Sequence, residues 1–327
     1  MIRIGLLGAS RIAVGAVIKP AAVFEAVQVH SVAARSPSRA LQYAATHTIP
    51  NTHPDYAALV SSPDIDLVYN ALPPSEHKHW TIAALRAGKH VLCEKPFALS
   101  AEEAEAMVGA ARETGNVLIE AFHYCFHPLF VRVMSLIEAD AIGTVRRVDG
   151  HFNTAIAFEP SELRYMRALG GGALMDLGCY PLHWARSVVG QEPDVVSASG
   201  EWHEAGVDVA MSVELAFPSG ATAHVQCSMS EDLPDGLDNT LRVTGEKGVL
   251  TATNLIAPHL GHKLLLETGQ GAVSETLSAS PTYHYQLQHV VDVIGGGAPQ
   301  RTGGKDAVNT MRLINAVYRK ALGQDAS

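Results

Sequence analysis

The stretch IRIGLLGASRIA, residues 2–13, decides the fold of the amino-terminal half. Its apolar residues run without a break to Leu7, which is typical of a strand buried on both faces of a parallel sheet. Gly8 then opens a turn, and the residues after it have helical spacing. Strand, glycine turn and helix in this order match the fingerprint G-x-G-x-x-G/A, in which the turn approaches the pyrophosphate of a dinucleotide.

The three fingerprint positions are Gly8, Ser10 and Ala13. Ser10 departs from the usual second glycine, so its side chain must point away from the phosphates or bond to them. We expect Gly8, Ser10, Arg11 and Ile12 to contact the cofactor at this turn. The competing interpretation is an ordinary strand–helix turn with no ligand.

Strands and helices alternate from the first residue to about residue 122. The expected strands are residues 2–8, 27–34, 65–72, 90–96 and 116–122. The helix over 100–115 is the clearest, since Ser100 and Glu103 form a capping box and Gly115 follows its end. This alternation predicts a Rossmann domain, a doubly wound parallel sheet in an α/β arrangement, over residues 1–122.

The pattern changes in the second half. Short strand-like segments follow one another with few helices between them, and PSG at 218–220 and GEKG at 245–248 link them as hairpin turns. We expect an α+β substrate-binding and oligomerisation domain over residues 123–327, built on a large, mostly antiparallel sheet. Helices are expected at residues 126–138, 173–189 and, as a C-terminal helix that packs back on the first domain, about 305–322.

Composition excludes several classes of protein. The chain has 327 residues, of which 47% are hydrophobic and 17% charged, so it can bury substantial cores. Its net charge is -9 and it has no Lys/Arg run, which argues against binding of nucleic acid or an anionic membrane. Four cysteines without a C-x-x-C pair indicate free thiols in a reducing compartment. Since no signal peptide and no apolar run of about 18 residues are visible, we expect a cytoplasmic protein.

The end of the second strand indicates which cofactor is used. NAD enzymes usually place Asp or Glu there to accept bonds from the ribose hydroxyls, but this chain has Ala34. Arg35 can bind a 2′-phosphate through a forked guanidinium, Ser36 can donate a hydroxyl bond, and Arg39 is a second cation. The sequence therefore favours NADP over NAD. The alternative is that Arg35 is a solvated surface arginine.

The stretch HVLCEKPFALS, residues 90–100, ends a buried strand on Lys95. Ligands of doubly wound sheets lie outside the carboxyl ends of the strands. An ammonium there can bond a substrate oxygen and stabilise negative charge beside a nicotinamide. For an isolated lysine, a plain surface position would be the default interpretation.

Three motifs resemble one known family. GLLGASRIA (5–13), CEKPFAL (93–99) and GGGALMDLGCYPLHW (170–184) are similar to the glucose–fructose oxidoreductase and inositol dehydrogenase (Gfo/Idh/MocA) family, and the resemblance extends to the helical tail KDAVNTMRLINAVYRKAL. It implies that Lys95 is catalytic, that the peptide before Pro96 is often cis, and that no metal is required. It also implies a homodimer or homotetramer formed through the antiparallel sheet.

A second cluster follows the three glycines. Asp176 and Tyr180 are four residues apart and share one face of a helix, and His183 can join them. The family pattern here is Asp-x-Gly-x-His or Asp-x-Gly-x-Tyr, and the tyrosine resembles the NADP-dependent sugar and dihydrodiol dehydrogenase branch. A phenol needs a nearby cation to act near neutral pH, and Lys95 could supply it. Asp176 would hold a substrate hydroxyl or orient the lysine; alternatively, Tyr180 is structural and Asp176 is a local cap.

Further candidates surround these residues. Arg164 either lies near the substrate, as a family arginine does, or pairs with a surface acid. His123 and His127 are four residues apart, which suits a metal only if acids join them, and we expect no metal. The additional cofactor candidates are Leu72, Pro73, His77 and Glu94. The additional substrate candidates are Glu120, His123, Arg164 and His183.

Together these features predict an NADP-dependent dehydrogenase or reductase. A hydride would pass between nicotinamide C4 and a carbinol or carbonyl carbon of a sugar, polyol or vicinal diol, with Lys95 and Tyr180 handling the proton of the oxygen. One alternative is a catalytically idle dinucleotide sensor that regulates a partner. Another is a sugar–sugar oxidoreductase that retains its cofactor.

Overall fold

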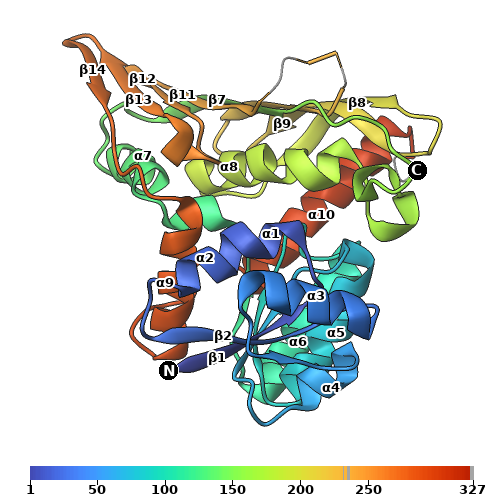
Figure 1. Ribbon diagram of the computed structural model, residues 1–327. Coiled ribbons are helices and arrows are strands. Elements are labelled where there is room, and N and C mark those ends of the chain that lie inside the picture. The colour runs from blue at the N-terminus through green and yellow to red at the C-terminus, as the bar shows by residue number, and fades with distance from the viewer. Residues whose placement is uncertain (231, 234–235, 325–327) are drawn as a thin grey trace. The chain divides into compact units, whose positions relative to one another are not determined.

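The computed structural model describes residues 1–230, 232–233 and 236–324. The chain forms two compact units (Figure 1). The first unit comprises Met1–His123 and Tyr283–Val308, and the second comprises Tyr124–Thr282 and Asn309–Ser327. Both expected sheets are present, one in each unit.

The first unit contains a six-stranded parallel sheet in the order β3-β2-β1-β4-β5-β6. The strands are β1 (Ile2–Leu7), β2 (Val27–Ala33), β3 (Asn51–Thr52), β4 (Leu67–Asn70), β5 (His90–Cys93) and β6 (Leu118–Glu120). The order reverses direction between β1 and β4, which is the switch point where doubly wound sheets bind ligands. The predicted Rossmann fold is therefore confirmed.

Helices flank this sheet (Figure 1). They are α1 (Arg11–Ala13), η1 (Val14–Ile18), α2 (Lys19–Ala21), α3 (Pro37–His47), α4 (Tyr56–Ser61), α5 (Pro74–Arg86), α6 (Ala101–Thr114) and α9 (Thr282–Ile294). The capping box of α6 is present, because Ser100 Oγ accepts from the Glu103 N–H at 3.3 Å and the Glu103 carboxylate accepts from the Leu99 N–H at 3.1 Å. Sequence reasoning missed β3 and α4, which are only two and six residues long.

The first helical stretch includes a proline, Pro20. Pro20 has no N–H to donate, but the preceding segment η1 is a π-helical turn, in which the Lys19 N–H donates to the carbonyl of Val14, five residues earlier. A π turn absorbs such an irregularity inside a helix. The segments α1, η1 and α2 therefore form one continuous helical stretch behind the glycine turn.

The helix that joins the first unit from the carboxy-terminal part of the chain is α9. Its residues Leu287 and Val290 are buried in one core with Ile4, Leu92 and Ile119. The loop after α9 covers the edge strand β6, with Gln300 Nε2 donating to the Leu118 carbonyl and Thr302 Oγ1 to the Glu120 carbonyl, both at 2.7 Å. Covering an edge strand removes a site for unwanted pairing.

The C-terminal helix is divided between the two units. Only the start of α10 (Gly304–Ala321) is counted with the first unit, which ends at Val308, and the rest belongs to the second unit. The apolar face of α9 is the one that packs on the Rossmann sheet.

The second unit contains an eight-stranded sheet in the order β14-β13-β12-β11-β7-β10-β9-β8. Its neighbours are antiparallel except for β7 and β10, which are parallel. The predicted turns at 218–220 and 245–248 link β9 to β10 and β11 to β12. The strands are β7 (Val145–Asn153), β8 (Asp194–Trp202), β9 (Asp208–Ala216), β10 (Thr222–Ser228), β11 (Asp238–Gly245), β12 (Gly248–Thr253), β13 (Lys263–Thr268) and β14 (Gly271–Glu275).

One face of this sheet is covered by helices of the same unit (Figure 1). The helical segments, besides α10, are η2 (His123–Phe126), α7 (Pro128–Glu138), η3 (Leu163–Tyr165), η4 (Arg167–Leu169), η5 (Leu174–Gly178), α8 (Cys179–Val189) and η6 (Pro258–Leu260). The helix α8 approaches β7 closely at Gly150, where a Cβ would lie 3.1 Å from Pro181 Cβ. On β9, Met211 and Val213 are buried, whereas Ser212 and Glu214 are partly exposed on the other face.

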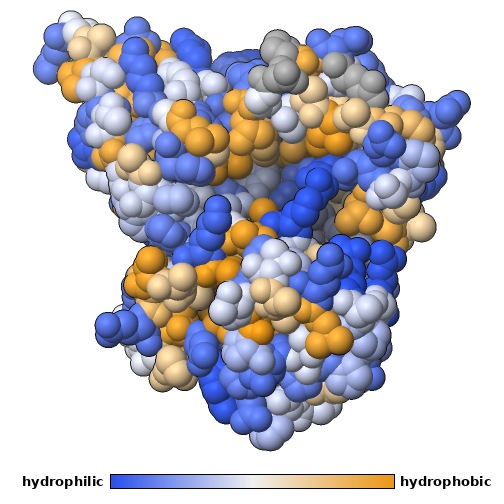
Figure 2. Space-filling model, in the orientation of Figure 1, coloured by the Kyte–Doolittle hydropathy of each residue, from blue (hydrophilic) through white to orange (hydrophobic). Residues whose placement is uncertain are grey.

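The cysteines Cys93, Cys125, Cys179 and Cys227 are buried free thiols. Burial raises the pKa of Cys93 and Cys227 well above the ordinary range. In the described part of the chain, no helix has both the length and the apolar character needed to cross a membrane. On the face seen in Figure 2, hydrophobic and hydrophilic residues are intermixed.

Candidate functional site

The nucleotide turn requires a glycine at position 8. Gly8 has φ +94°, and a Cβ there would lie 3.1 Å from Leu72 Cδ2. Its N–H donates to the Ala33 carbonyl at 2.9 Å, which fixes the end of β1 against β2. The turn therefore brings bare backbone to the carboxyl edge of the sheet, as a pyrophosphate site requires.

Ser10 is the N-cap of the helix that follows. Its Oγ accepts a hydrogen bond from the Ala13 N–H at 3.3 Å, so the hydroxyl is turned toward its own helix. This gives a physical reason for the departure from the usual glycine, since serine is a favoured N-cap. Arg11 and Ile12 are exposed on the first turn of the same helix.

The end of β2 carries no carboxylate. Ala34 is buried, and Arg35 after it is exposed. Ser36 caps α3 by accepting from the Arg39 N–H at 3.3 Å, and Arg39 Nη2 donates to the Ala9 carbonyl at 3.1 Å. The guanidinium of Arg39 is thus tied to the nucleotide turn, while Arg35 extends into solvent beside it.

Tyr56 was missed by sequence reasoning. Burial raises the pKa of its phenol, and the nearby positive charges of Arg35 and Arg39 oppose this rise, so both cations lie near Tyr56. Its ring packs edge-on against Trp80, with centroids 5.3 Å apart. An isolated tyrosine in a six-residue helix gives no sequence signal for such a position.

His77 is a buried residue of α5. It has no exposed surface; its Nε2 is 2.8 Å from the Leu72 carbonyl oxygen and its Nδ1 is 3.0 Å from the Pro96 carbonyl oxygen. The expected direct contact with the cofactor is therefore corrected: His77 ties the loop after β4 to the loop after β5. Leu72 is also buried, and Pro73 is the N-cap of α5.

Lys95 stands immediately after β5 and is partly exposed. The peptide between Lys95 and Pro96 is cis, as the resemblance implied. Glu94, which is buried, accepts from the Tyr69 hydroxyl at 2.5 Å and from the Lys95 N–H at 3.3 Å. The carboxylate is thus directed at the backbone of Lys95 and at Tyr69, whose pKa is raised well above 10 by burial and by Glu94.

In the second unit, Arg164 pairs with Asp176. Arg164 Nε donates to Asp176 Oδ2 at 2.6 Å, and Nη1 donates to Glu162 Oε1 at 2.9 Å. The Asp176 charge is the main reason why the pKa of Arg164 is raised. Of the two alternatives for Arg164, pairing with an acid is therefore observed, but that acid is the predicted catalytic aspartate.

Asp176 and Tyr180 lie on one helical stretch of mixed geometry. Asp176 sits in the π-helical turn η5, and Tyr180 is in the first turn of α8. The Tyr180 side chain is 3% exposed and packs against Phe152 of β7 and against Tyr124, with ring centroids 5.6 and 5.9 Å apart. π turns occur frequently at functional sites, and the regular α spacing assumed from the sequence did not anticipate this one.

The histidine and glutamate candidates occupy interior positions. His183 is 4% exposed, and its Nδ1 is hydrogen-bonded to the Tyr124 hydroxyl. His123, in the first unit, stacks on Tyr283 with centroids 4.3 Å apart. Glu120 has no exposed surface, so a direct contact of its side chain with substrate is not supported.

His127 caps a helix. Its Nδ1 accepts from the Leu129 N–H at 3.0 Å, and its Nε2 is 3.2 Å from the Ser280 carbonyl oxygen. Burial lowers its pKa to about 4. Within the described ranges, no group of three His, Cys, Asp or Glu residues is arranged to hold a metal ion.

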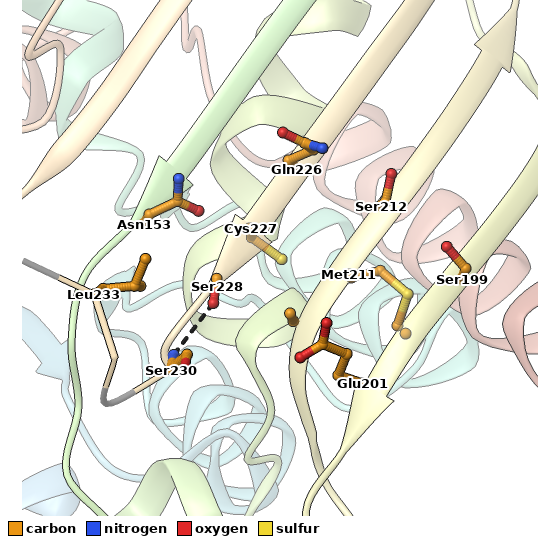
Figure 3. A pocket seen from close by; sticks show the side chains of 12 residues that line it. Asn153, Ser199, Glu201, Met211, Ser212, Gln226, Cys227, Ser228, Ser230 and Leu233 are labelled. Carbon is orange, nitrogen blue, oxygen red and sulfur yellow. Dashed lines mark hydrogen bonds between the residues drawn. The ribbon is translucent and has the colours of Figure 1, made fainter.

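The second unit also has a hollow of about 560 Å³ on the sheet, lined by both polar and apolar residues (Figure 3). Residues Ser199, Ser212, Gln226 and Asn153 line it, together with residues of the loop after β10. These strand positions alternate with buried Met211 and Cys227, so they belong to the face opposite the helices. The hollow is therefore separate from the Arg164–Asp176 pair.

Comparison with known proteins identifies the family. The model of the oxidoreductase family with an NAD-binding Rossmann fold matches residues 2–122, and the model of the GFO/IDH/MocA C-terminal domain matches residues 130–251. The chain belongs to the Gfo/Idh/MocA family of oxidoreductases. This confirms the family inferred from the three motifs.

Relatives within the Gfo/Idh/MocA family act on sugars and diols by name. D-xylose 1-dehydrogenase (NADP(+)) 2 of Haloferax volcanii is 32% identical over 317 residues, 97% of this chain and 96% of the relative. Trans-1,2-dihydrobenzene-1,2-diol dehydrogenase of Sus scrofa is 37% identical over 223 residues, 68% of this chain and 65% of the relative. The crystal structure of aldose-aldose oxidoreductase from Caulobacter crescentus complexed with glycerol has a TM-score of 0.89 at 29% identity and covers 99% of this chain and 98% of that chain.

Proposed function

We propose that this protein is an NADP-dependent dehydrogenase or reductase of a sugar, polyol or vicinal diol. The observation that carries the proposal is the 2.6 Å ion pair between Arg164 and Asp176. Asp176 lies on the helical stretch that also carries Tyr180. Carboxylate and guanidinium groups are suited to hydroxyl-rich substrates, and the phenol can exchange a proton. The names of the relatives support this class of substrate.

The cofactor is NADP, and the residues of the first unit fit it. Gly8 supplies the close-approach turn, and Arg35 and Arg39 supply positive charge where an acidic residue would repel a 2′-phosphate. Ser10 and Ser36 shape the two helix starts through their caps. When bound, NADP provides the nicotinamide C4 that exchanges a hydride with the substrate carbon.

The protein's part in the chemistry is to hold and move the proton of the substrate oxygen. In the oxidation direction, the phenolate of Tyr180, stabilised by the ammonium of Lys95, takes the hydroxyl proton and becomes the neutral phenol, while the ammonium also stabilises the negative charge that develops on the substrate oxygen. In the reduction direction, Tyr180 returns that proton. The mechanism thus uses one group from each unit, Lys95 from the first and Tyr180 from the second.

Asp176 positions the substrate in this proposal. A carboxylate paired with Arg164 can accept a hydrogen bond from a second hydroxyl next to the reacting carbon. Arg164, which also donates to Glu162, holds that carboxylate in place from the segment before the glycine run. A vicinal pair of hydroxyls, as in a sugar, an inositol or a dihydrodiol, satisfies this arrangement.

A second candidate is a sugar–sugar oxidoreductase that keeps its cofactor through successive turnovers. It is favoured by the similarity to aldose-aldose oxidoreductase over 99% of the chain. The test that separates it is the state of the purified protein. Retained NADP(H) and turnover of mixed sugars without added cofactor would support it, and release of the cofactor on dilution would exclude it.

We also propose that the protein assembles as a homodimer or homotetramer in the cytoplasm. The face of the eight-stranded sheet that carries Ser212 and Gln226 is opposite the helices of its own unit, which leaves it available for a second copy. Buried free thiols suit a reducing compartment. Light scattering after size exclusion should give two or four chains, and Gln226→Arg should lower that number.

The function is tested by mixing the purified protein with NADP⁺ and a panel of aldoses, inositols and cyclic vicinal diols. Absorbance should rise at the band of reduced nicotinamide, and faster with NADP⁺ than with NAD⁺. Tyr180→Phe should abolish the signal while NADP⁺ binding persists. Cofactor binding without an absorbance change for any substrate, in either direction, would instead favour the regulatory dinucleotide sensor.

A further inference from the structure

Asp208 is a buried carboxylate that has no part in the mechanism above. It is the first residue of β9 and is 1% exposed. Its Oδ2 accepts from the Leu174 N–H at 2.6 Å, and its Oδ1 accepts from the Tyr318 hydroxyl at 2.7 Å. A buried carboxylate is costly unless it is hydrogen-bonded, so these two short bonds define its function in the fold.

The first of these bonds reaches the stretch that carries the proposed chemistry. Leu174 is the first residue of η5, two residues before Asp176 and six before Tyr180. A carboxylate at the start of a helical stretch satisfies an N–H that has no partner within the helix and interacts favourably with the helix dipole. Asp208 therefore fixes the amino end of η5 and α8.

The glycine run makes this contact possible. Gly172 has φ +127°, and a Cβ there would lie 2.3 Å from Asp208 Oδ1 and 2.9 Å from the Tyr318 hydroxyl oxygen. Gly171 is equally restricted, since a Cβ there would lie 2.5 Å from the Arg164 carbonyl oxygen. The glycines thus let the Asp208 carboxylate and the Arg164 backbone pack directly against the start of η5.

The second bond connects this point to α10, which also holds the other end of α8. There, Arg186 Nη1 donates to Thr310 Oγ1 at 2.7 Å, and Asn309 Nδ2 donates to Glu192 Oε1 at 2.8 Å. Glu192 in turn accepts from Arg186 Nε at 2.6 Å. The helical stretch from Leu174 to Val189 is therefore tied to α10 at both ends.

We propose that Asp208, acting with Tyr318, is a positioning residue for Asp176 and Tyr180. It sets the rotation and depth of the helical stretch at its amino end, where displacement would move both side chains together. The inference rests on the proposed function, since it concerns the placement of those two groups. A misplacement of about 1 Å at a reacting group is enough to cost on the order of 10²-fold in rate.

Three variants test this. Asp208→Ala removes both acceptors, Asp208→Asn keeps one acceptor oxygen for Leu174, and Tyr318→Phe removes only the hydroxyl. We expect kcat to fall roughly 100-fold, 10-fold and 3- to 10-fold respectively, with little change in the KM for NADP⁺. The pH profile of kcat should shift in the same order, because the surroundings of Tyr180 change.

A control separates positioning from loss of stability. Leu264 is buried on β13, which four other strands separate from β9. Leu264→Ala should lower the unfolding temperature by a similar amount while leaving kcat and its pH profile unchanged. If Asp208→Ala does not fold, Tyr318→Phe and Asp208→Asn still decide the question.

These variants distinguish failure of the positioning role of Asp208 from failure of the proposed role of Tyr180. If Tyr180→Phe abolishes activity but Tyr318→Phe and Asp208→Asn leave kcat and the pH profile as in the wild type, the positioning role is overturned and the proposed function stands. If Tyr180→Phe retains full activity, Tyr180 is not the group that exchanges the proton and the proposed mechanism fails, whereas an absence of turnover in the wild type with every substrate would overturn the proposed function. A lower kcat in the Asp208 and Tyr318 variants, with an unchanged value in Leu264→Ala, supports the inference.

Discussion

The two units present their chemical groups in different ways. In the first, Lys95 directly follows a regular strand, and the nucleotide turn offers backbone shaped by Gly8. In the second, Asp176 stands in a π turn and is held by Arg164, twelve residues earlier in the chain. The first arrangement depends on local sequence and strand order, whereas the second depends on contacts between distant segments. Substitutions should therefore act locally in the first unit and through the whole cluster in the second.

Removal of Lys95 should have the largest effect on turnover of any substitution in the first unit. We expect Lys95→Ala to lower kcat by about 10³-fold, because it removes the cation that stabilises the phenolate and the substrate oxygen. Binding of NADP⁺, followed by fluorescence quenching, should change little. A variant with near wild-type kcat would show that the two units do not share one reacting oxygen.

Gly172→Ala should be the most destabilising of the small substitutions. Its Cβ would meet the Asp208 carboxylate at 2.3 Å, with φ in the left-handed region, so we expect a loss of about 3 kcal/mol in the free energy of unfolding. The matched control is Gly109→Ala in α6, where nothing lies within 4 Å of the added Cβ. Gly109→Ala should raise the free energy of unfolding by about 0.5–1 kcal/mol. Urea titration measures the free energy of unfolding of both variants. Equal effects at the two glycines would remove the contrast between the units.

Loss of Arg164 should weaken the substrate cluster as a unit. We expect Arg164→Met to lower kcat/KM for the sugar roughly 30- to 100-fold, since Asp176 then loses its charged partner at 2.6 Å. Arg164→Lys should recover only part of this, because an ammonium cannot reproduce the fork to Asp176 and Glu162. Steady-state kinetics at saturating NADP⁺ measures the difference. Full activity in both variants would limit Arg164 to a surface ion pair.

Arg35 should affect only the choice of cofactor. Arg35→Ala is expected to weaken NADPH binding about 10-fold or more, the value of one charge-assisted phosphate bond, and to leave NADH binding nearly unchanged. Calorimetric titration with each dinucleotide gives both constants. Equal weakening of the two would remove the argument for a 2′-phosphate contact.

The smallest expected effect is on the pH dependence of stability, to which His127 contributes. Its pKa is about 4 in the folded protein, below the ordinary 6.5, so the unfolded chain takes up the proton first as the pH falls. Its contribution to stability is therefore complete above pH 6.5 and is lost as the pH falls toward 4. His127→Asn keeps a capping side chain that cannot titrate, and its unfolding temperature should fall less between pH 7.5 and 5. Parallel curves for the two proteins would contradict the assignment.

The sequence predicted those features of the fold that are determined by residues close together in the chain. The order of strand, Gly8 turn and helix specified the Rossmann unit, and the position of Lys95 after a buried strand specified its place at the rim. The resemblance located Asp176 and Tyr180, but the π turn that carries Asp176 could not be derived from spacing. Asp208 was missed because its partner Leu174 is 34 residues away, and a lone aspartate before a strand gives no signal.

His77 shows the opposite error. Its position after the third predicted strand suggested a ligand contact, but its two ring nitrogens face main-chain oxygens of the loops around Lys95. Sequence gives the distance of a residue from a motif along the chain, and it does not give the direction of its side chain. Similarly, the sequence did not indicate that α9 belongs to the first unit, and only its packing in one core with Ile4 and Ile119 shows this.

The four buried thiols give each unit its own chemical reporter. Cys93 lies in the first unit, and Cys125, Cys179 and Cys227 lie in the second. A thiol that is buried, with a raised pKa, reacts slowly with alkylating reagents until its surroundings open. Pulsed alkylation followed by peptide mass spectrometry would therefore record, in the unmodified protein, whether the Rossmann unit and the sheet unit melt together or one after the other.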